Sequence, residues 1–164
     1  MQIFSQIRDI PYSIPLIFGE EDRSCVGKNL LLLKQLSTLG YTVRWRVCEF
    51  LWSSLSLPDK VKQLPHDDAS SHAYLEVLIN DVWQTVDATW DSRLASILPV
   101  ATWDGSRSTM IAVVPTNIFS SEKSAEIINN LSQGEFEKDM KANGEFYRAF
   151  NEWLVEVRKL RLEK

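Results

Sequence analysis

Two runs of strand-forming residues, SHAYLEVLI and VWQTVDATW, are separated by only two residues, Asn80 and Asp81. Asn and Asp tolerate the positive φ angles of a two-residue hairpin loop, and β-branched and aromatic side chains favour extended chain. The sequence therefore predicts a β-hairpin over residues 71–90. Because Ile79 must then face Val82, the hairpin also has a defined register, which constrains the fold more than any other feature of the chain.

That register places two polar side chains together. Asp87 lies opposite Tyr74 in the predicted hairpin, and His72 shares the face of Tyr74 because side chains alternate along a strand. His72 and Asp87 become diagonal neighbours, with Cβ atoms about 7 Å apart or less. The carboxylate can then hold one imidazole nitrogen and leave the other as a base. Taken singly, each residue is more often structural: a half-buried strand histidine, or an aspartate that accepts from a backbone amide.

A helix is predicted before the hairpin. Asp22 or Ser24 can act as its N-cap, the run VGKNLLLLKQLSTL follows without a breaker, and Gly40 stands where a left-handed residue ends a helix. Its leucines cover most of the circumference, so the helix is expected to be buried on nearly all sides. Cys25 opens it, where free N–H groups and the helix dipole favour a thiolate. The alternative is a small buried hydrophobe.

Four further segments give simpler signals. Residues 1–21 contain Pro and Gly among short apolar runs and predict extended or irregular chain. Residues 42–52 predict a strand, and residues 53–71 predict a long loop. Residues 109–115, TMIAVVP, form a short β-like run after a turn at Asp104-Gly105.

From Ser121 onward the chain is expected to be helical. A weaker segment near 122–131 is followed, past Gly134 and Asn143-Gly144, by an apolar stripe at helical spacing. Such a stripe belongs to an amphipathic helix that packs on the body, or else to a partner-binding face. Its members are Phe146, Phe150, Trp153, Leu154, Val157 and Leu160. The chain is therefore interpreted as one α+β domain over 1–164, with a motif-bearing core at about 22–115 and helices at about 121–164.

Composition excludes several classes of function. A net charge of −4 without a basic block argues against nucleic acid, and no apolar stretch approaches the roughly 20 residues needed to cross a bilayer. A soluble, cytoplasmic protein with no membrane partner is expected. The spacings of Cys25, Cys48, His66 and His72 do not resemble a structural zinc site, so neither a metal nor a cofactor is expected. Free thiols are favoured over a single Cys25–Cys48 bridge.

The segments SCVGKNLLLLKQLSTLGYTVRWRV and HAYLEVLINDVWQTVDATWD together resemble the core of the transglutaminase-like superfamily. The resemblance spans about Arg23 to Asp91, under half of the chain. It implies a papain-like fold, with a buried N-terminal helix packed on an antiparallel sheet, and a Cys-His-Asp triad in this chain order. By position, Cys25 would be the nucleophile, His72 the general base and acid, and Asp87 the orienting carboxylate.

The chemistry implied by the resemblance is thiol-dependent acyl transfer. A Cys25 thiolate would attack the amide carbonyl of a peptide or protein, and water or an amine would resolve the thioester. The backbone N–H of Cys25 can serve as one oxyanion donor, whereas Tyr12 and Gln63 are alternatives for a side-chain donor. His66 and Asp91 are the spare histidine and carboxylate.

Two other interpretations stay open. The chain could be a catalytically inactive transglutaminase-fold binding module that uses the region of Trp52, Trp90 and Trp103, or Cys25 and Cys48 could have a structural or redox role. Seven acidic residues and two lysines lie between Leu57 and Asp91, and their field would favour amine-bearing substrates. A solvated acidic loop explains the same charges. The sequence does not decide the oligomeric state.

Overall fold

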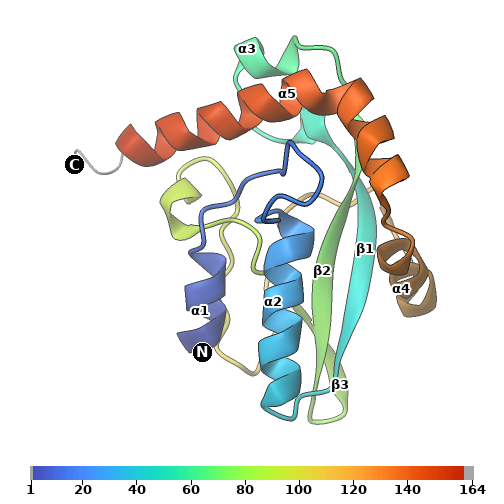
Figure 1. The fold of residues 1–164 in the computed structure, drawn as a ribbon. Coiled ribbons are helices and arrows are strands. Elements are labelled where there is room, and N and C mark those ends of the chain that lie inside the picture. Colours follow the sequence, from blue (N-terminus) through green and yellow to red (C-terminus); the bar gives the residue numbers. More distant parts are fainter. Residues whose placement is uncertain (1, 161–164) are drawn as a thin grey trace.

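The computed structural model describes residues 2–160; Met1 and the last four positions of the expected C-terminal helical segment, 161–164, lie outside them. The fold is α+β, with a curled antiparallel sheet in the order β3-β2-β1-β4 and helices around it (Figure 1). In chain order the elements are α1 (Gln2–Arg8), α2 (Cys25–Thr38), β1 (Val43–Leu51), η1 (Trp52–Ser54), α3 (Asp59–Lys62), β2 (Ala69–Ile79), β3 (Val82–Val86), η2 (Ser92–Leu94), β4 (Asn117–Ile118), α4 (Ser121–Asn129) and α5 (Gln133–Leu160).

The predicted hairpin and its register are confirmed. β2 pairs with β3 from Ile79↔Val82 to Leu75↔Val86, and Asn80 and Asp81 have φ angles of 49° and 62°. Two consecutive positive φ angles are typical of a type I′ loop, whose twist matches that of the flanking strands. β3 ends at Val86, four residues before the end of the predicted run, so Asp87 begins the segment that leaves the sheet.

The helix that opens with Cys25 is α2, with Ser24 as its N-cap, and Gly40 has the expected left-handed φ of 86°. The expectation that it is buried on nearly all sides is wrong. Leu30 and Leu31 are 38% and 43% exposed, whereas Lys28 and Asn29 are 1% and 0% exposed. These two polar side chains point inward because they form hydrogen bonds with the N-terminal segment, with β2 and with the segment after β3.

Other expectations also need correction. Residues 1–21 are not extended throughout, because Gln2–Arg8 form α1, which packs through Phe4 and Ile7. Residues 109–115 form no strand; only Asn117–Ile118 pairs with β1, as β4. The predicted 53–71 loop contains α3 and the start of β2. Gly134 and Asn143-Gly144 do not interrupt α5, which is continuous from 133 to 160.

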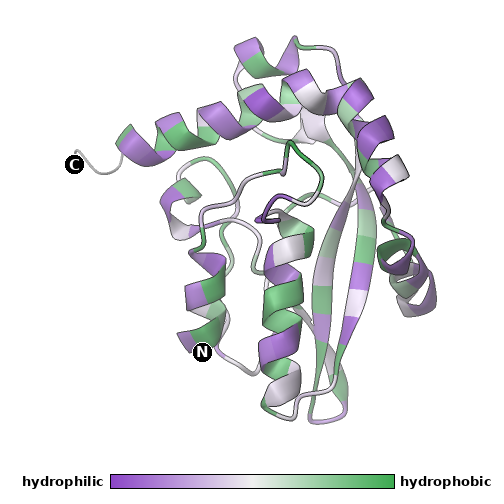
Figure 2. Ribbon diagram, in the orientation of Figure 1, coloured by the Kyte–Doolittle hydropathy of each residue, from purple (hydrophilic) through white to green (hydrophobic). Residues whose placement is uncertain are grey.

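The core forms two clusters. One lies between α1, α2 and the sheet and includes Leu32, Leu36, Leu75 and Val77. The other contains most of the aromatic residues and lies beneath α5, which crosses one end of the sheet and contributes Phe146, Phe150, Trp153 and Leu154 (Figure 1). The packing expected for the α5 stripe is therefore confirmed for these four residues, and Leu160 is exposed. Figure 2 shows polar and apolar residues alternating along α5, as expected for a helix packed on one side.

Candidate active site

The hairpin brings His72 and Asp87 into direct contact. Nε2 of His72 lies 2.7 Å from Oδ2 of Asp87, and the two residues are 3% and 1% exposed. His72 is two positions before Tyr74 on β2, and Asp87 directly follows β3, so this is the diagonal contact predicted from the register. With Nε2 committed to the carboxylate, Nδ1 is the nitrogen left for a second partner.

Asp87 is held as a carboxylate by a full set of donors. Its Oδ1 accepts from the backbone N–H and hydroxyl of Thr89, at 3.1 and 2.6 Å, and its Oδ2 also accepts from the backbone N–H of Ala112, at 2.8 Å. Burial acts to raise the pKa of Asp87, but the charge and hydrogen bond of His72, together with these donors, lower it instead. Segment 109–115, which is not a strand, thus supplies a donor that holds the carboxylate.

His72 is poised to carry a proton. Burial alone lowers its pKa, but the Asp87 carboxylate and the Cys25 side chain, acting through charge and hydrogen bonding, raise the pKa to about 10. Since Nε2 is bound to Asp87, the interaction with Cys25 falls to Nδ1. The structure therefore brings together all three residues singled out in the sequence.

The N-terminus of α2 positions Cys25. Ser24 accepts a hydrogen bond from the backbone N–H of Val26 at 3.3 Å, and Asp22 accepts one from the N–H of Ser24 at 2.8 Å. A Cβ on Gly27 would lie 1.8 Å from the carbonyl oxygen of Asp22, so only glycine lets the preceding loop pack this closely on the helix. The Cys25 N–H makes no hydrogen bond to any residue in 2–160 and lies at the positive end of the helix dipole.

Asn29, one turn along α2, ties the three parts of the site together. Its Nδ2 donates to the carbonyl oxygens of Cys25, at 2.9 Å, and Ala73, at 3.1 Å, and its Oδ1 accepts from the N–H of Ala88 at 3.3 Å. Cys25, β2 and the segment after β3 are thereby linked through one buried amide. The sequence interpretation missed this role; the only signal was a polar residue one turn after the cysteine in an otherwise leucine-rich helix.

Lys28 was also missed. Its Nζ donates to three backbone carbonyls, those of Arg8 at 2.7 Å, Ile10 at 2.8 Å and Thr89 at 2.5 Å. It therefore fastens the N-terminal segment and the segment after β3 to α2. Burial lowers the pKa of Lys28 to about 7, although Asp91 acts in the opposite direction.

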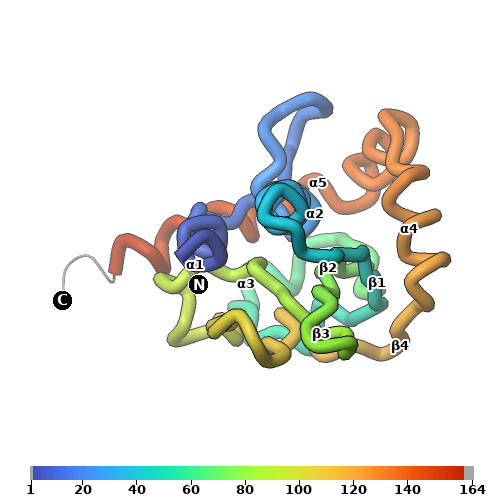
Figure 3. The backbone as a smooth tube through the Cα atoms, turned by 90° about the horizontal axis from the view of Figure 1, so that it is seen from below, coloured from blue at the N-terminus to red at the C-terminus, as the bar shows by residue number. Residues whose placement is uncertain are grey.

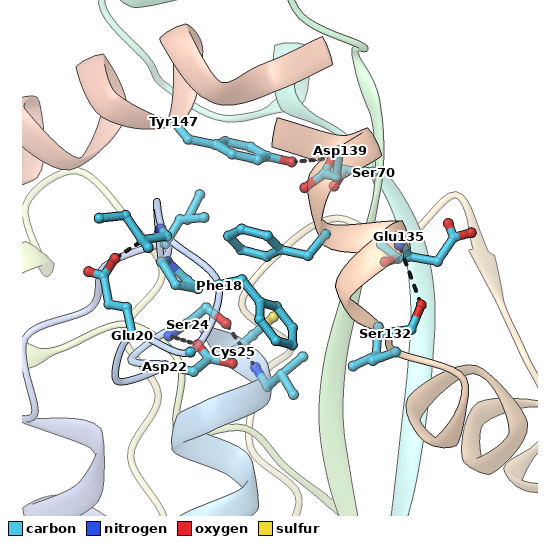
Figure 4. Close-up of a pocket in the computed structure, with 18 of the residues that line it drawn as sticks. Phe18, Glu20, Asp22, Ser24, Cys25, Ser70, Ser132, Glu135, Asp139 and Tyr147 are labelled. Atoms are coloured by element: carbon cyan, nitrogen blue, oxygen red, sulfur yellow. Dashed lines mark hydrogen bonds between the residues drawn. The ribbon is translucent and has the colours of Figure 1, made fainter. Parts of the chain in front are cut away.

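Cys25 lies at the base of a pocket of about 520 Å³, and Figure 4 shows its sulfur among residues of the loop before α2 and of α5. Aromatic side chains form much of the wall, and the charged residues that line it are all acidic. The aromatic and acidic lining residues include Tyr12, Phe18, Glu20, Asp22, Glu135, Phe136, Asp139 and Tyr147. Figure 3 shows the loop before α2 projecting away from the sheet. Residues of this loop belong to the lining of the pocket.

The acidic residues of 57–91 do not provide this lining. None of the seven is among the pocket residues; Asp87 is buried behind Cys25, and the four lining acids come from the loop before α2 and from α5. Glu20 and Asp22 also have structural partners, since they accept from backbone N–H groups of their own loop. The acidic charge of the pocket therefore comes from residues outside 57–91.

The spare candidates have structural contacts. His66 stacks on Phe146 with ring centroids 4.0 Å apart, and its Nδ1 bonds to the carbonyl of Leu64. Asp91 forms a buried ion pair with Arg158, at 2.7 Å. Among the two side chains considered as oxyanion donors, Tyr12 lines the pocket, whereas Gln63 caps α3 and does not.

The remaining alternatives fare differently. Trp52, Trp90 and Trp103 are only 3–5% exposed, and of the three only Trp52 lines the pocket. Cys25 and Cys48 are free thiols, and Cys48 is fully buried opposite His72 on β1. Burial, with smaller effects from Asp87 and Cys25, raises the pKa of Cys48 to about 12.

Within residues 2–160, no group of three or more His, Cys, Asp or Glu could hold a metal ion, and no helix is long and apolar enough to span a membrane.

Comparison of the chain with protein-family models, with curated proteins and with solved structures returns no match.

Proposed function

We propose that this protein is a cysteine-nucleophile acyltransferase or amide hydrolase with a papain-like, transglutaminase-like core. The single observation that carries the proposal is the buried chain of contacts from Asp87 to His72 to Cys25, which ends at an open pocket. A buried histidine–aspartate pair beside a cysteine at a helix N-terminus is what a thiolate nucleophile requires. A structural cysteine needs none of these partners.

The proposed reaction begins with a proton on His72 and a thiolate at Cys25. The sulfur attacks the carbonyl carbon of an amide, a C–S bond forms, and the carbonyl electron pair moves to oxygen. When that oxyanion collapses, the C–N bond breaks and Nδ1 of His72 gives its proton to the departing amine. Asp87 keeps the imidazole oriented and stabilises its charged form.

The thioester is then resolved by a second nucleophile. Water or an amine attacks the acyl carbon, His72 takes its proton, and the C–S bond breaks to regenerate the thiolate–imidazolium pair. Because all charged residues that line the pocket are acidic, neutral and cationic amides are favoured as substrates over acidic ones. The geometry supports either acceptor.

Selective alkylation tests the proposal. Iodoacetamide should modify Cys25 at least about 10-fold faster than glutathione at about pH 6, because the start of α2 and the neighbouring His72 activate the sulfur in the proposed mechanism. Cys48 is the internal control, since it is fully buried and should stay unmodified in the folded protein. Mass spectrometry of peptides distinguishes the two sites.

Hydrolysis of p-nitrophenyl acetate provides the second readout. Cys25→Ala should abolish it, whereas Cys48→Ala should retain it as long as the variant folds. Reaction of Cys25 at the rate of glutathione, or full esterase activity in Cys25→Ala, would contradict the proposal and leave a non-catalytic domain with the same fold.

A further inference from the structure

Tyr12 combines burial with an uncommitted hydroxyl. The residue is 5% exposed and lines the pocket together with Cys25. Within residues 2–160 its Oη has no hydrogen-bond partner, and it is not among the fully buried polar atoms, so the hydroxyl is accessible from the pocket. Tyr147, which lines the same pocket, differs in this respect, because its hydroxyl donates to Asp139 at 3.1 Å. Tyr12 therefore keeps a donor available in the pocket that holds the nucleophile.

The hydroxyl of Tyr12 also keeps its proton. Burial raises the pKa of Tyr12 well above 10, and the negative charges of Cys25 and Asp22 act in the same direction. At any ordinary assay pH the phenol is a neutral hydrogen-bond donor.

The backbone of Tyr12 is clamped by a buried ion pair. Its N–H donates to Oδ2 of Asp91 at 3.1 Å, and its carbonyl oxygen accepts from Nη2 of Arg158 at 2.8 Å. The same Nη2 contacts Asp91 at 2.7 Å. The ring packs against Trp90, with centroids 4.5 Å apart. A side chain fixed at both its backbone and its ring loses little freedom when it donates a hydrogen bond.

A hydroxyl so placed suits the charge that the proposed reaction develops. When the Cys25 sulfur adds to a carbonyl, the oxygen becomes an anion and needs fixed donors around it. The free backbone N–H of Cys25 at the start of α2 supplies one of them. We infer that the Tyr12 hydroxyl is the side-chain donor to this oxyanion, and that the Asp91–Arg158 pair is the positioning device that holds it. This inference rests on the proposed function.

Two reactions of the same sulfur separate the inference from the proposed function. Alkylation by iodoacetamide displaces iodide and forms no oxyanion, whereas acylation by p-nitrophenyl acetate adds the thiolate to the carbonyl before p-nitrophenolate leaves. Tyr12→Phe should lower the acylation rate of Cys25 roughly 10²-fold to 10³-fold, and should change its alkylation rate by no more than about twofold. Arg158→Lys, which keeps the charge but loses the planar fork, should lower acylation by a smaller factor and again leave alkylation unchanged.

Tyr41→Phe is the matched control, because Tyr41 packs against the other core cluster and is not among the pocket residues. It should change neither rate. Equal losses of both rates in Tyr12→Phe would show a structural role, and full acylation in that variant would remove Tyr12 from the reaction; either result overturns the inference. If Cys25 of the unmodified protein reacts with neither reagent, the proposed function itself has failed.

Discussion

Two buried carboxylates in the same segment, Asp87 and Asp91, each form an ion pair 2.7 Å long, yet the pairs differ in what they can do. Asp87 binds His72, whose ring can gain or lose a proton and whose other nitrogen serves Cys25. Asp91 binds Arg158, whose guanidinium stays charged because it is not deprotonated in proteins. The second pair holds the backbone of Tyr12 instead of a reacting atom.

Burial and a short contact do not by themselves identify a chemically reactive site. What distinguishes the His72–Asp87 pair is that it titrates and reaches the pocket through Cys25. The Asp91–Arg158 pair links α5 to the segment after β3 and to the N-terminal segment, so its main effect should be on stability. Removing one partner from each pair should therefore have different consequences.

The largest expected effect is on the reactivity of Cys25 in Asp87→Asn. An amide cannot stabilise the imidazolium of His72, so in the proposed mechanism Cys25 loses its activating partner, and its alkylation rate at about pH 6 should fall roughly 10²-fold to 10⁴-fold. The amide nitrogen would also face donors of Thr89 or Ala112, which costs about 1–3 kcal/mol of stability. Circular dichroism should show that the variant is folded under the assay conditions.

Asp68→Asn is the control for that substitution. Asp68 also accepts from a backbone N–H and a hydroxyl, both of Ser53, but it is exposed and does not contact His72. Its substitution should leave the alkylation rate within about twofold of the original, as is usual for an exposed site. A folded Asp87→Asn protein that reacts as fast as this control would show that the His72–Asp87 pair does not activate Cys25.

The next largest effect is on stability, in Arg158→Met. The substitution leaves the Asp91 carboxylate buried without its partner, which costs about 3–5 kcal/mol in the free energy of unfolding. Lys60→Met is the control, because the exposed Lys60–Glu156 pair also joins α5 to the body and should be worth about 1 kcal/mol or less. Urea unfolding measures both. Equal losses of unfolding free energy in the two variants would mean that the buried Asp91–Arg158 pair contributes no more to stability than the exposed Lys60–Glu156 pair.

The two pairs were not equally predictable from the sequence. His72 and Asp87 are 15 residues apart within one hairpin, so the two-residue loop and the alternation of strand side chains were enough to bring them together. Asp91 and Arg158 are 67 residues apart, and their contact depends on how α5 crosses the sheet. Hydrophobic periodicity predicts that such a helix packs on the body, but not where along the body each residue lands.

Helix α2 shows a second limit. Counting leucines predicted burial on nearly all sides, but the orientation of α2 depends on Lys28 and Asn29, whose partners include backbone carbonyls of β2 and of the segment after β3. Because a buried polar side chain is stable only when its partners are in place, these segments and the helix determine each other's position. The position of Cys25 at the helix N-terminus was predictable from Ser24 and Gly40, whereas the pocket that it lines was not.

The smallest expected effect, counted per pH unit, is on the pH dependence of stability. His72 has a pKa raised from 6.5 to about 10 in the folded protein, so its stabilising contribution is fully present below pH 6.5 and is lost as the pH rises through 10. The difference in unfolding free energy between the original protein and His72→Asn should shrink over this range, by at most about 1.4 kcal/mol per pH unit for one proton.

The difference in unfolding free energy between the original protein and Arg158→Met should instead grow slightly over the same range. Burial lowers the pKa of Lys28 to about 7; Asp91 acts to raise this pKa, and Arg158 acts to lower it further. The repulsion between Arg158 and Lys28 therefore ends once the pH is high enough for Lys28 to lose its proton. Urea unfolding of the three proteins at intervals between about pH 6 and pH 10 measures both trends. A difference for His72→Asn that stays level or grows across this range would mean that the pair does not titrate, and the contrast between the two carboxylates would then be one of position only.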